Sequence, residues 1–170
     1  KIKMSLMNHV VRMCDLSFDQ KLFETFHCGT ALDELLSSHQ GLPRGVNYMI
    51  IGDPGVGKTT IILDMLANMQ KRYPLARILF ISAEMNEIDL TVYVERYPKF
   101  QTLPILFVES DFDNQIHNWD VIKNVVEQGW DIVAIDSFYE LQGIIKDEEN
   151  IRMKEAESWL LQLISEVQTD

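Results

Sequence analysis

Apolar residues recur along this chain in two spacings, which predict strands interleaved with helices. Short apolar runs bounded by turn residues are typical of buried strands, whereas apolar residues three or four positions apart are typical of helices. Strands are expected over residues 46–51, 77–82, 103–108 and 131–135. Helices are expected over residues 30–38, 60–70, 114–128 and 151–168, the first with its inward face formed by Leu32, Leu35 and Leu36. This alternation predicts an α/β fold with a mostly parallel sheet.

Two stretches need a separate interpretation. Residues 86–97 alternate like a strand, yet Asn86 is a good helix cap and Pro98 a good helix stop. Residues 1–25 contain no clean strand and are interpreted as a linker or docking segment. This interpretation leaves residues 26–170 as the core.

Size and composition favour one soluble, globular domain. The chain has 170 residues, of which 46% are hydrophobic, and a mean hydropathy of −0.05, enough for a proper core. No apolar run approaches the roughly 20 residues that cross a bilayer, so no membrane partner is expected. Cys14 and Cys28 form no C-x-x-C pair, and reduced thiols in a cytoplasmic protein are the expectation.

The net charge of −11 argues against a protein that binds nucleic acid over its whole surface. It does not argue against nucleotide binding, because charges beyond about 8 Å are largely screened at physiological salt and the local field decides. Nor does it exclude a ring that gathers a few basic loops around a central strand of nucleic acid.

Residues 52–59 read Gly-Asp-Pro-Gly-Val-Gly-Lys-Thr and match the G-x-x-x-x-G-K-[ST] phosphate loop at every position. The candidate nucleotide-binding residues are Gly52, Asp53, Pro54, Gly55, Val56, Gly57, Lys58 and Thr59. An expected strand before the loop and an expected helix after it supply the context that phosphate binding needs. This context disfavours the alternative, an accidental glycine turn, so we expect the chain to bind ATP.

A triphosphate carries several negative charges that fixed donors must meet. The three loop glycines let main-chain N–H groups converge on the phosphates, and the helix N-terminus adds about half a positive charge. Lys58 is expected to reach the β- and γ-phosphates, Thr59 to bind Mg²⁺, and Thr60 to touch the α-phosphate.

Two apolar strands are followed by an acid that suits phosphoryl transfer. Asp136 ends the apolar run 132–135, where a carboxylate can hold a magnesium-bound water beside Thr59. Its alternative is a carboxylate that only caps the next turn. Glu84 follows the strand over residues 77–82 and could polarise the water that attacks the γ-phosphate. Its alternative is a solvated carboxylate at a strand end.

Several segments together resemble the RecA-like P-loop ATPases, in particular RadA/Sms, the DnaB-type replicative helicases and KaiC. Residues 29–36 and 41–45 resemble the segment ahead of the first core strand, and residues 52–59 are very similar to the RadA phosphate loop. Residues 82–85, Ser-Ala-Glu-Met, resemble the helicase segment that carries the catalytic base. Residues 136–137 resemble the Walker B end of RecA, RadA and KaiC.

The resemblance covers residues 26–168 and implies a RecA-like ATPase that acts on single-stranded DNA as a homo-oligomer, either a hexamer or a filament. It implies Glu84 as the catalytic base and a helix over residues 86–97. Family members often place an arginine or an aromatic residue of that helix against the adenine. Arg96 or Tyr93 is therefore the candidate adenine contact, although both equally suit a surface position.

The chain also departs from the family pattern. Residues 37–40 replace the usual glycines, and the family's next core strand, with its polar sensor residue and the second DNA loop, would follow Asp170. The first DNA loop would lie at residues 143–152. There Lys146 and Arg152 are outweighed by acidic residues, so a solvated acidic loop is favoured over a DNA contact.

The sequence leaves more than one function open. The preferred hypothesis is an ATP-driven DNA motor or recombination ATPase, because the order of the motifs resembles nucleic-acid ATPases most. A KaiC-like regulatory ATPase that binds protein partners is the alternative, which the acidic charge favours slightly. A weaker third hypothesis, a nucleotide-gated assembly domain, requires that Glu84 be idle.

Overall fold

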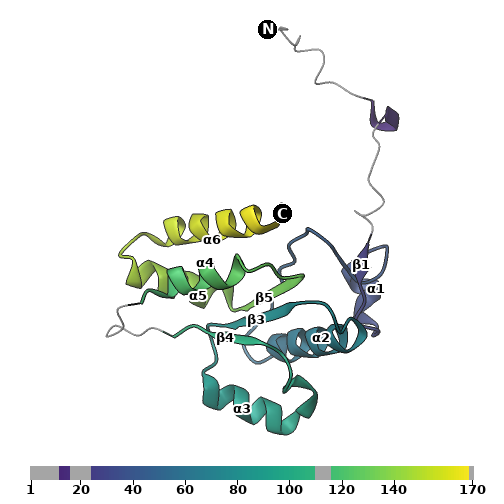
Figure 1. The fold of residues 1–170 in the computed structure, drawn as a ribbon, viewed down its shortest axis with the longest axis horizontal. Helices are drawn as coiled ribbons and strands as arrows, with labels where there is room; N and C mark the ends of the chain where they lie inside the picture. The colour runs from purple at the N-terminus through teal and green to yellow at the C-terminus, as the bar shows by residue number, and fades with distance from the viewer. Residues whose placement is uncertain (1–11, 16–23, 110–115, 169–170) are drawn as a thin grey trace.

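The computed structural model describes residues 12–15, 24–109 and 116–168. Its centre is a three-stranded sheet in the order β4-β3-β5, with both pairings parallel. The strands are β3 (Ile78–Ser82), β4 (Ile105–Phe107) and β5 (Ile132–Asp136). Helices lie on both sides of this sheet (Figure 1), which confirms the α/β fold.

The helices form two layers. One layer holds α2 (Lys58–Arg72) and α3 (Glu87–Arg96), which is followed by the 3-10 helix η4 (Pro98–Phe100). The other layer holds α4 (Asn118–Val126), α5 (Phe138–Glu148) and α6 (Met153–Gln168). Among the described residues, none of the helices combines the length and apolarity that crossing a membrane requires.

A smaller unit precedes the main sheet. β1 (Thr25–Phe26) pairs antiparallel with β2 (Leu42–Pro43), and α1 (Leu32–Leu36) lies between them in the chain. The 3-10 helix η2 (Met13–Asp15) comes before this unit. The segment over residues 1–25, interpreted as a linker, lies mostly outside the described residues.

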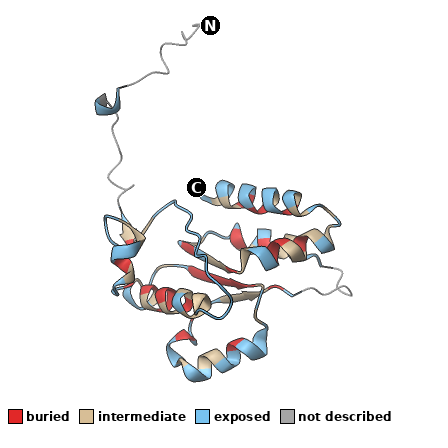
Figure 2. Ribbon diagram, turned by 180° about the vertical axis from the view of Figure 1, so that it is seen from behind, coloured by how far each residue is buried: buried red, intermediate tan, exposed pale blue. Residues whose placement is uncertain are grey.

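The two helical layers bury opposite faces of β3. Ile78 and Phe80 belong to the apolar cluster against α2 and α3, whereas Leu79 and Ile81 belong to the cluster against α4, α5 and α6. Successive side chains of a strand point to opposite faces, so a strand covered on both faces is apolar throughout. Figure 2 shows the buried residues gathered on the strands and on the helix sides that face them.

Helix α3 confirms the helical interpretation of residues 86–97. The side chain of Asn86 accepts a 3.0 Å hydrogen bond from the amide of Asp89, whose carboxylate accepts a 3.4 Å bond from the amide of Asn86. This capping box satisfies two donors that a helix N-terminus otherwise leaves open. The helices expected over 60–70 and 151–168 are also present, as α2 and α6. The helix expected over 114–128 appears as α4, and residues 114 and 115 lie outside the described residues.

The strand expected over residues 46–51 is wrong. None of the described strands pairs with this segment, and a strand exists only where a neighbour takes up its main-chain hydrogen bonds. The apolar side chains of the segment are therefore exposed, Met49 to 75% and Ile51 to 85%. Side chains hold the segment instead: the Tyr48 hydroxyl donates to the carbonyl of Leu36, and the side chain of Gln168 donates to that of Asn47 at 2.7 Å.

Two further expectations need correction. Leu35 does not face inward but is 81% exposed, because α1 turns Leu32 and Leu36, four positions apart, toward the core. The expected DNA loop over residues 143–152 is mostly helical, since α5 continues to Glu148. Buried apolar residues four positions apart, Leu141 and Ile145, extend that helix past the expected loop start.

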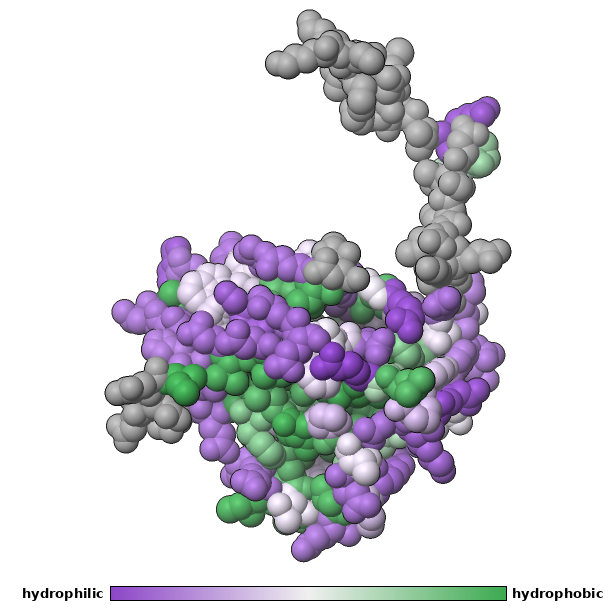
Figure 3. All heavy atoms as spheres, viewed as in Figure 1, coloured by the Kyte–Doolittle hydropathy of each residue, from purple (hydrophilic) through white to green (hydrophobic). Residues whose placement is uncertain are grey.

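The outer edge of the sheet at β4 is apolar. A shallow groove of about 200 Å³ between α3 and β4 is lined by residues that include Leu90, Val94, Ile105 and Phe107. Figure 3 shows apolar surface between α3 and the helices on the other side of the sheet. Among the described strands β4 pairs with β3 alone, so this surface follows the free edge of a strand.

Candidate nucleotide-binding site

The phosphate loop leads into α2 and is open to solvent. Gly57 is the N-cap of α2 with a φ of +97°, and Gly55 has a φ of +80°. A Cβ at either position would meet nothing within 4 Å, so these glycines are required for their conformation. Gly52 lies outside this region of φ, but a Cβ there would come within 3.1 Å of the Val56 side chain. Gly52 therefore does not share the left-handed φ of Gly55 and Gly57, and a Cβ there would need only a small shift of the exposed Val56 side chain.

Lys58 folds back onto its own loop. Its Nζ donates hydrogen bonds to the carbonyl oxygens of Gly52 at 2.8 Å and Asp53 at 2.9 Å. The ammonium is thus held beside the loop main chain by neutral acceptors. Phosphate oxygens, which are charged, can replace these acceptors.

Thr59 and Asp136 come together from different elements. The Thr59 hydroxyl, in the first turn of α2, donates a 2.6 Å hydrogen bond to the carboxylate of Asp136 at the end of β5. Asp136 is only 4% exposed. A hydroxyl and a carboxylate are hard oxygen ligands of the kind that Mg²⁺ prefers, so this pair fits a magnesium site.

Glu84 lies two residues beyond the end of β3 with its side chain exposed. The main-chain carbonyl of Asp136 accepts hydrogen bonds from the amides of Ala83 at 2.8 Å and Glu84 at 3.2 Å. Ser82 and Asp136 are also direct partners in the parallel ladder. Because parallel strands bring their carboxyl ends to one edge of a sheet, the two strand-end acids lie on the same side of the site.

A comparison with known protein families matches residues 31–168 to the AAA domain. The chain belongs to the AAA domain family. It is also similar to the DNA repair protein RadA of a Synechocystis species, at 31% identity over 87 residues. This similarity spans 51% of the chain and 16% of the relative. Family and relative together support a RecA-like P-loop ATPase.

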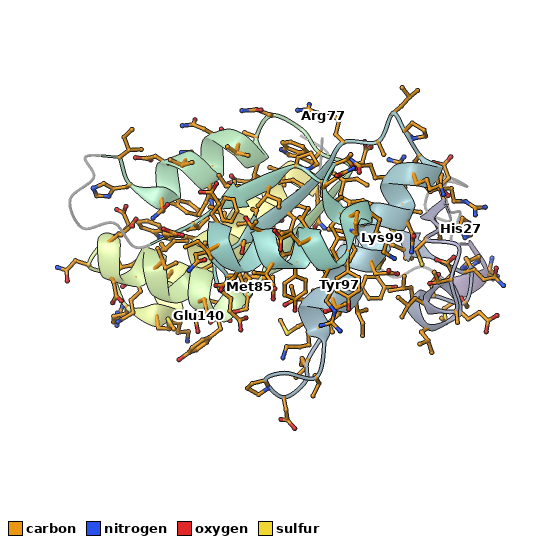
Figure 4. The ribbon with its side chains drawn as sticks, turned by 90° about the horizontal axis from the view of Figure 1, so that it is seen from below. His27, Arg77, Met85, Tyr97, Lys99 and Glu140 are labelled. Atoms are coloured by element: carbon orange, nitrogen blue, oxygen red, sulfur yellow. The ribbon has the colours of Figure 1, made fainter. Side chains whose placement is uncertain are left out.

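In this AAA domain, α3 approaches α2 at Thr60. The Thr60 hydroxyl donates to the hydroxyl of Tyr93 at 3.4 Å. The guanidinium of Arg96 instead lies 5.3 Å from the ring centre of Tyr97, which Figure 4 places at the opposite end of α3 from Met85. Of the two candidates for an adenine contact, Tyr93 therefore touches the phosphate-loop helix and Arg96 packs against an aromatic ring.

Sequence reasoning missed Asp33, which organises the segment ahead of the loop in this AAA domain. Its carboxylate accepts 2.8 Å hydrogen bonds from the amides of Cys28 and Gly29 and a 3.1 Å bond from the Cys28 thiol. Burial acts to raise the pKa of Asp33, but these hydrogen bonds leave the pKa below its ordinary value. The sequence does contain a signal for this role: Asp33 lies four positions after Gly29, in the first turn of a short helix, where an aspartate can accept hydrogen bonds from the amides of a preceding turn.

Proposed function

We propose that this domain hydrolyses ATP as the core of a RecA-like, DNA-dependent ATPase of the DNA recombination and repair or replicative helicase type. The observation that carries the proposal is the 2.6 Å hydrogen bond between Thr59 and Asp136. It joins the hydroxyl after the loop lysine to a buried strand-end carboxylate, the pairing that metal-assisted phosphoryl transfer needs.

Each residue of the site has a role in this proposal. Phosphoryl transfer asks a protein mainly to position groups and to stabilise charge. The loop amides and the N-terminus of α2 bind the phosphates, and Lys58 turns from its carbonyl partners toward the β- and γ-phosphates. Thr59 and Asp136 would hold Mg²⁺, which neutralises charge on the phosphate oxygens. Glu84 orients the attacking water and accepts its proton.

The proposed DNA partner has separate support. The matched relative is named as a DNA repair protein, and the order of the motifs resembles nucleic-acid ATPases. We propose single-stranded DNA as the partner and a homo-oligomer, hexamer or filament, as the working form. The chain spans only 16% of the relative's length.

Phosphate release from Mg-ATP, with and without single-stranded DNA, tests this function. Glu84→Gln should lower turnover by about 10²-fold or more, the usual contribution of a positioned base. Glu140→Gln is the matched control, because Glu140 is an exposed glutamate in the first turn of α5. Wild-type turnover in Glu84→Gln would contradict the catalytic role of Glu84.

A KaiC-like regulatory ATPase that acts on protein partners is the second candidate. The observation that favours it lies at residues 143–152, where Lys146 contacts Asp147 at 2.6 Å and Arg152 contacts Glu155 at 3.2 Å. These basic side chains are already matched by acids. Turnover that DNA does not change at low salt, where phosphate contacts are strongest, would favour this candidate over the first.

A further inference from the structure

The turn that carries Glu84 is fixed at both ends. The amide of Glu84 donates a hydrogen bond to the carbonyl of Asp136, and the capping box of Asn86 fixes the start of α3 just beyond the turn. The Glu84 side chain is exposed, so its placement depends on the main chain that carries it. Whatever fixes the turn therefore fixes the Cα of Glu84 and limits the region that its carboxylate can reach.

Ser82 ends an otherwise apolar strand with a buried hydroxyl. Its Oγ donates a 2.7 Å hydrogen bond to the carbonyl of Met85, and the residue is only 1% exposed. A buried hydroxyl is stable in a core when it makes a hydrogen bond. An alanine at position 82 would keep the strand apolar and would need no hydrogen-bond partner. We therefore ask what the hydroxyl of Ser82 does.

The position of Ser82 is set by the sheet. It pairs with Phe107 on β4 and with Asp136 on β5, and its carbonyl accepts a 2.9 Å hydrogen bond from the amide of Val108. At the other end of the turn, Met85 packs against the apolar cluster under α2 and α3, and Figure 4 shows it at the start of α3. The hydroxyl thus links the end of β3 to Met85, the residue before the N-cap of α3.

We propose that Ser82 is a positioning residue for ATP hydrolysis, because its hydroxyl closes the turn over residues 82–85 and holds Glu84 beside Asp136. The inference rests on the proposed function, since Ser82 acts only through Glu84. The hydrogen bond from Ser82 to Met85 closes the turn around Glu84, and the amide of Glu84 donates to the carbonyl of Asp136. Ser82 and Asp136 therefore both contribute a hydrogen bond to the same turn.

Loss of the hydroxyl has a defined consequence. The hydrogen bond of Ser82 goes to Met85 and not to Lys58 or Thr59, so ATP affinity and the Mg²⁺ requirement should stay unchanged. The turn would loosen, and a displacement of about 1 Å in a catalytic group can cost about 10²-fold in rate. We expect Ser82→Ala to lower kcat by about 10-fold to 100-fold with KM unchanged.

A double-mutant cycle tests the inference. Steady-state ATP hydrolysis, which gives kcat and KM, is measured for the wild type, Ser82→Ala, Glu84→Gln and the double variant, with ATP affinity measured by titration calorimetry. Because Ser82 acts through Glu84, Ser82→Ala should cause no further loss in the Glu84→Gln background. The matched control is Ser158→Ala, which removes a hydroxyl that donates to the carbonyl of Lys154 on α6.

The outcomes separate the two proposals. A loss at Ser82→Ala that is equally large in the Glu84→Gln background, a kcat within twofold of the wild type, or a joint fall of kcat and ATP affinity would each overturn the role of Ser82. Turnover that survives Glu84→Gln would instead overturn the proposed base, and with it any action through that base.

Discussion

The hydroxyl of Thr59 and the carboxylate of Asp136 form a 2.6 Å hydrogen bond although the residues lie 77 positions apart in the chain. The bond connects the first turn of α2 with the tip of β5. It places two hard oxygen ligands together at the mouth of the phosphate loop, where metal-assisted phosphoryl transfer requires them.

Asp136→Asn should weaken both hydrolysis and the use of Mg²⁺. The amide keeps the shape of the side chain but loses the charge that would hold Mg²⁺. Even loss of a group that only orients a metal ligand typically costs about 10–100-fold, so a loss of at least that size is expected. The rate of hydrolysis measured against Mg²⁺ concentration checks this, with the exposed Asp120→Asn in α4 as control. An unchanged Mg²⁺ requirement in Asp136→Asn would count against the proposed magnesium site.

Lys58→Ala should lower ATP affinity. A hydrogen bond to a charged group contributes about 1.5–3 kcal/mol, which corresponds to about 10–100-fold in affinity. Lys58→Arg should not restore it, because a planar guanidinium does not replace a compact ammonium on a flexible stem. Calorimetric titration with ATP measures both, and Lys71→Ala in the last turn of α2 is the control. Equal affinities for all four proteins would refute the phosphate-loop assignment.

Tyr93→Ala should weaken ATP binding more than Arg96→Ala. Tyr93 contacts Thr60 beside the loop, whereas Arg96 lies over Tyr97. If the adenine stacks on the ring of Tyr93, its removal costs about 1–3 kcal/mol by analogy with other base–aromatic contacts. Competition between ATP and ribose triphosphate, which lacks the adenine, measures the contribution of the base to affinity. A larger loss of that contribution in Arg96→Ala than in Tyr93→Ala would identify the arginine as the adenine contact.

Asp33→Asn should destabilise the domain and reduce the dependence of its free energy of unfolding on pH in the acidic range. Because the folded pKa of Asp33 lies below the ordinary value of 3.8, its stabilising effect is present above that value and is lost as the pH falls through the lower folded pKa. An asparagine oxygen accepts fewer of the hydrogen bonds from Cys28 and Gly29, which should cost about 1–3 kcal/mol near neutral pH. Urea unfolding at pH 7 and at pH 3 measures the difference. A variant that is equally destabilised at both values would contradict this account.

The phosphate loop and the two strand-end acids could be predicted because each is a local pattern. The sequence of residues 52–59 by itself specifies a phosphate loop. Parallel strands bring Glu84 and Asp136 to one edge of the sheet once the fold is known. The strand expected over residues 46–51 failed for the opposite reason. An apolar run indicates a capacity to pair, while a strand also needs a partner that the run itself does not contain.

Contacts that no motif specifies could not be predicted from the sequence. The hydrogen bonds from Ser82 to Met85 and from Thr60 to Tyr93 depend on how α3 packs against β3 and α2. The cap and stop of α3 were visible in the sequence, although residues 86–97 alternate like a strand, but the rotation of the helix was not. The structure therefore adds the residues that hold the site in place to those that the motif already named.

The unpaired segment at residues 46–51 gives the phosphate loop two unequal arms. The downstream arm is α2, whose amides beyond the first turn make helical hydrogen bonds, while none of the described strands pairs with the upstream arm. Main-chain amides of the upstream arm should therefore exchange with solvent deuterium far faster than those of α2. A nucleotide that binds the loop would also reduce the motion of residues 46–51. Part of its binding free energy would therefore offset the loss of conformational entropy in that segment.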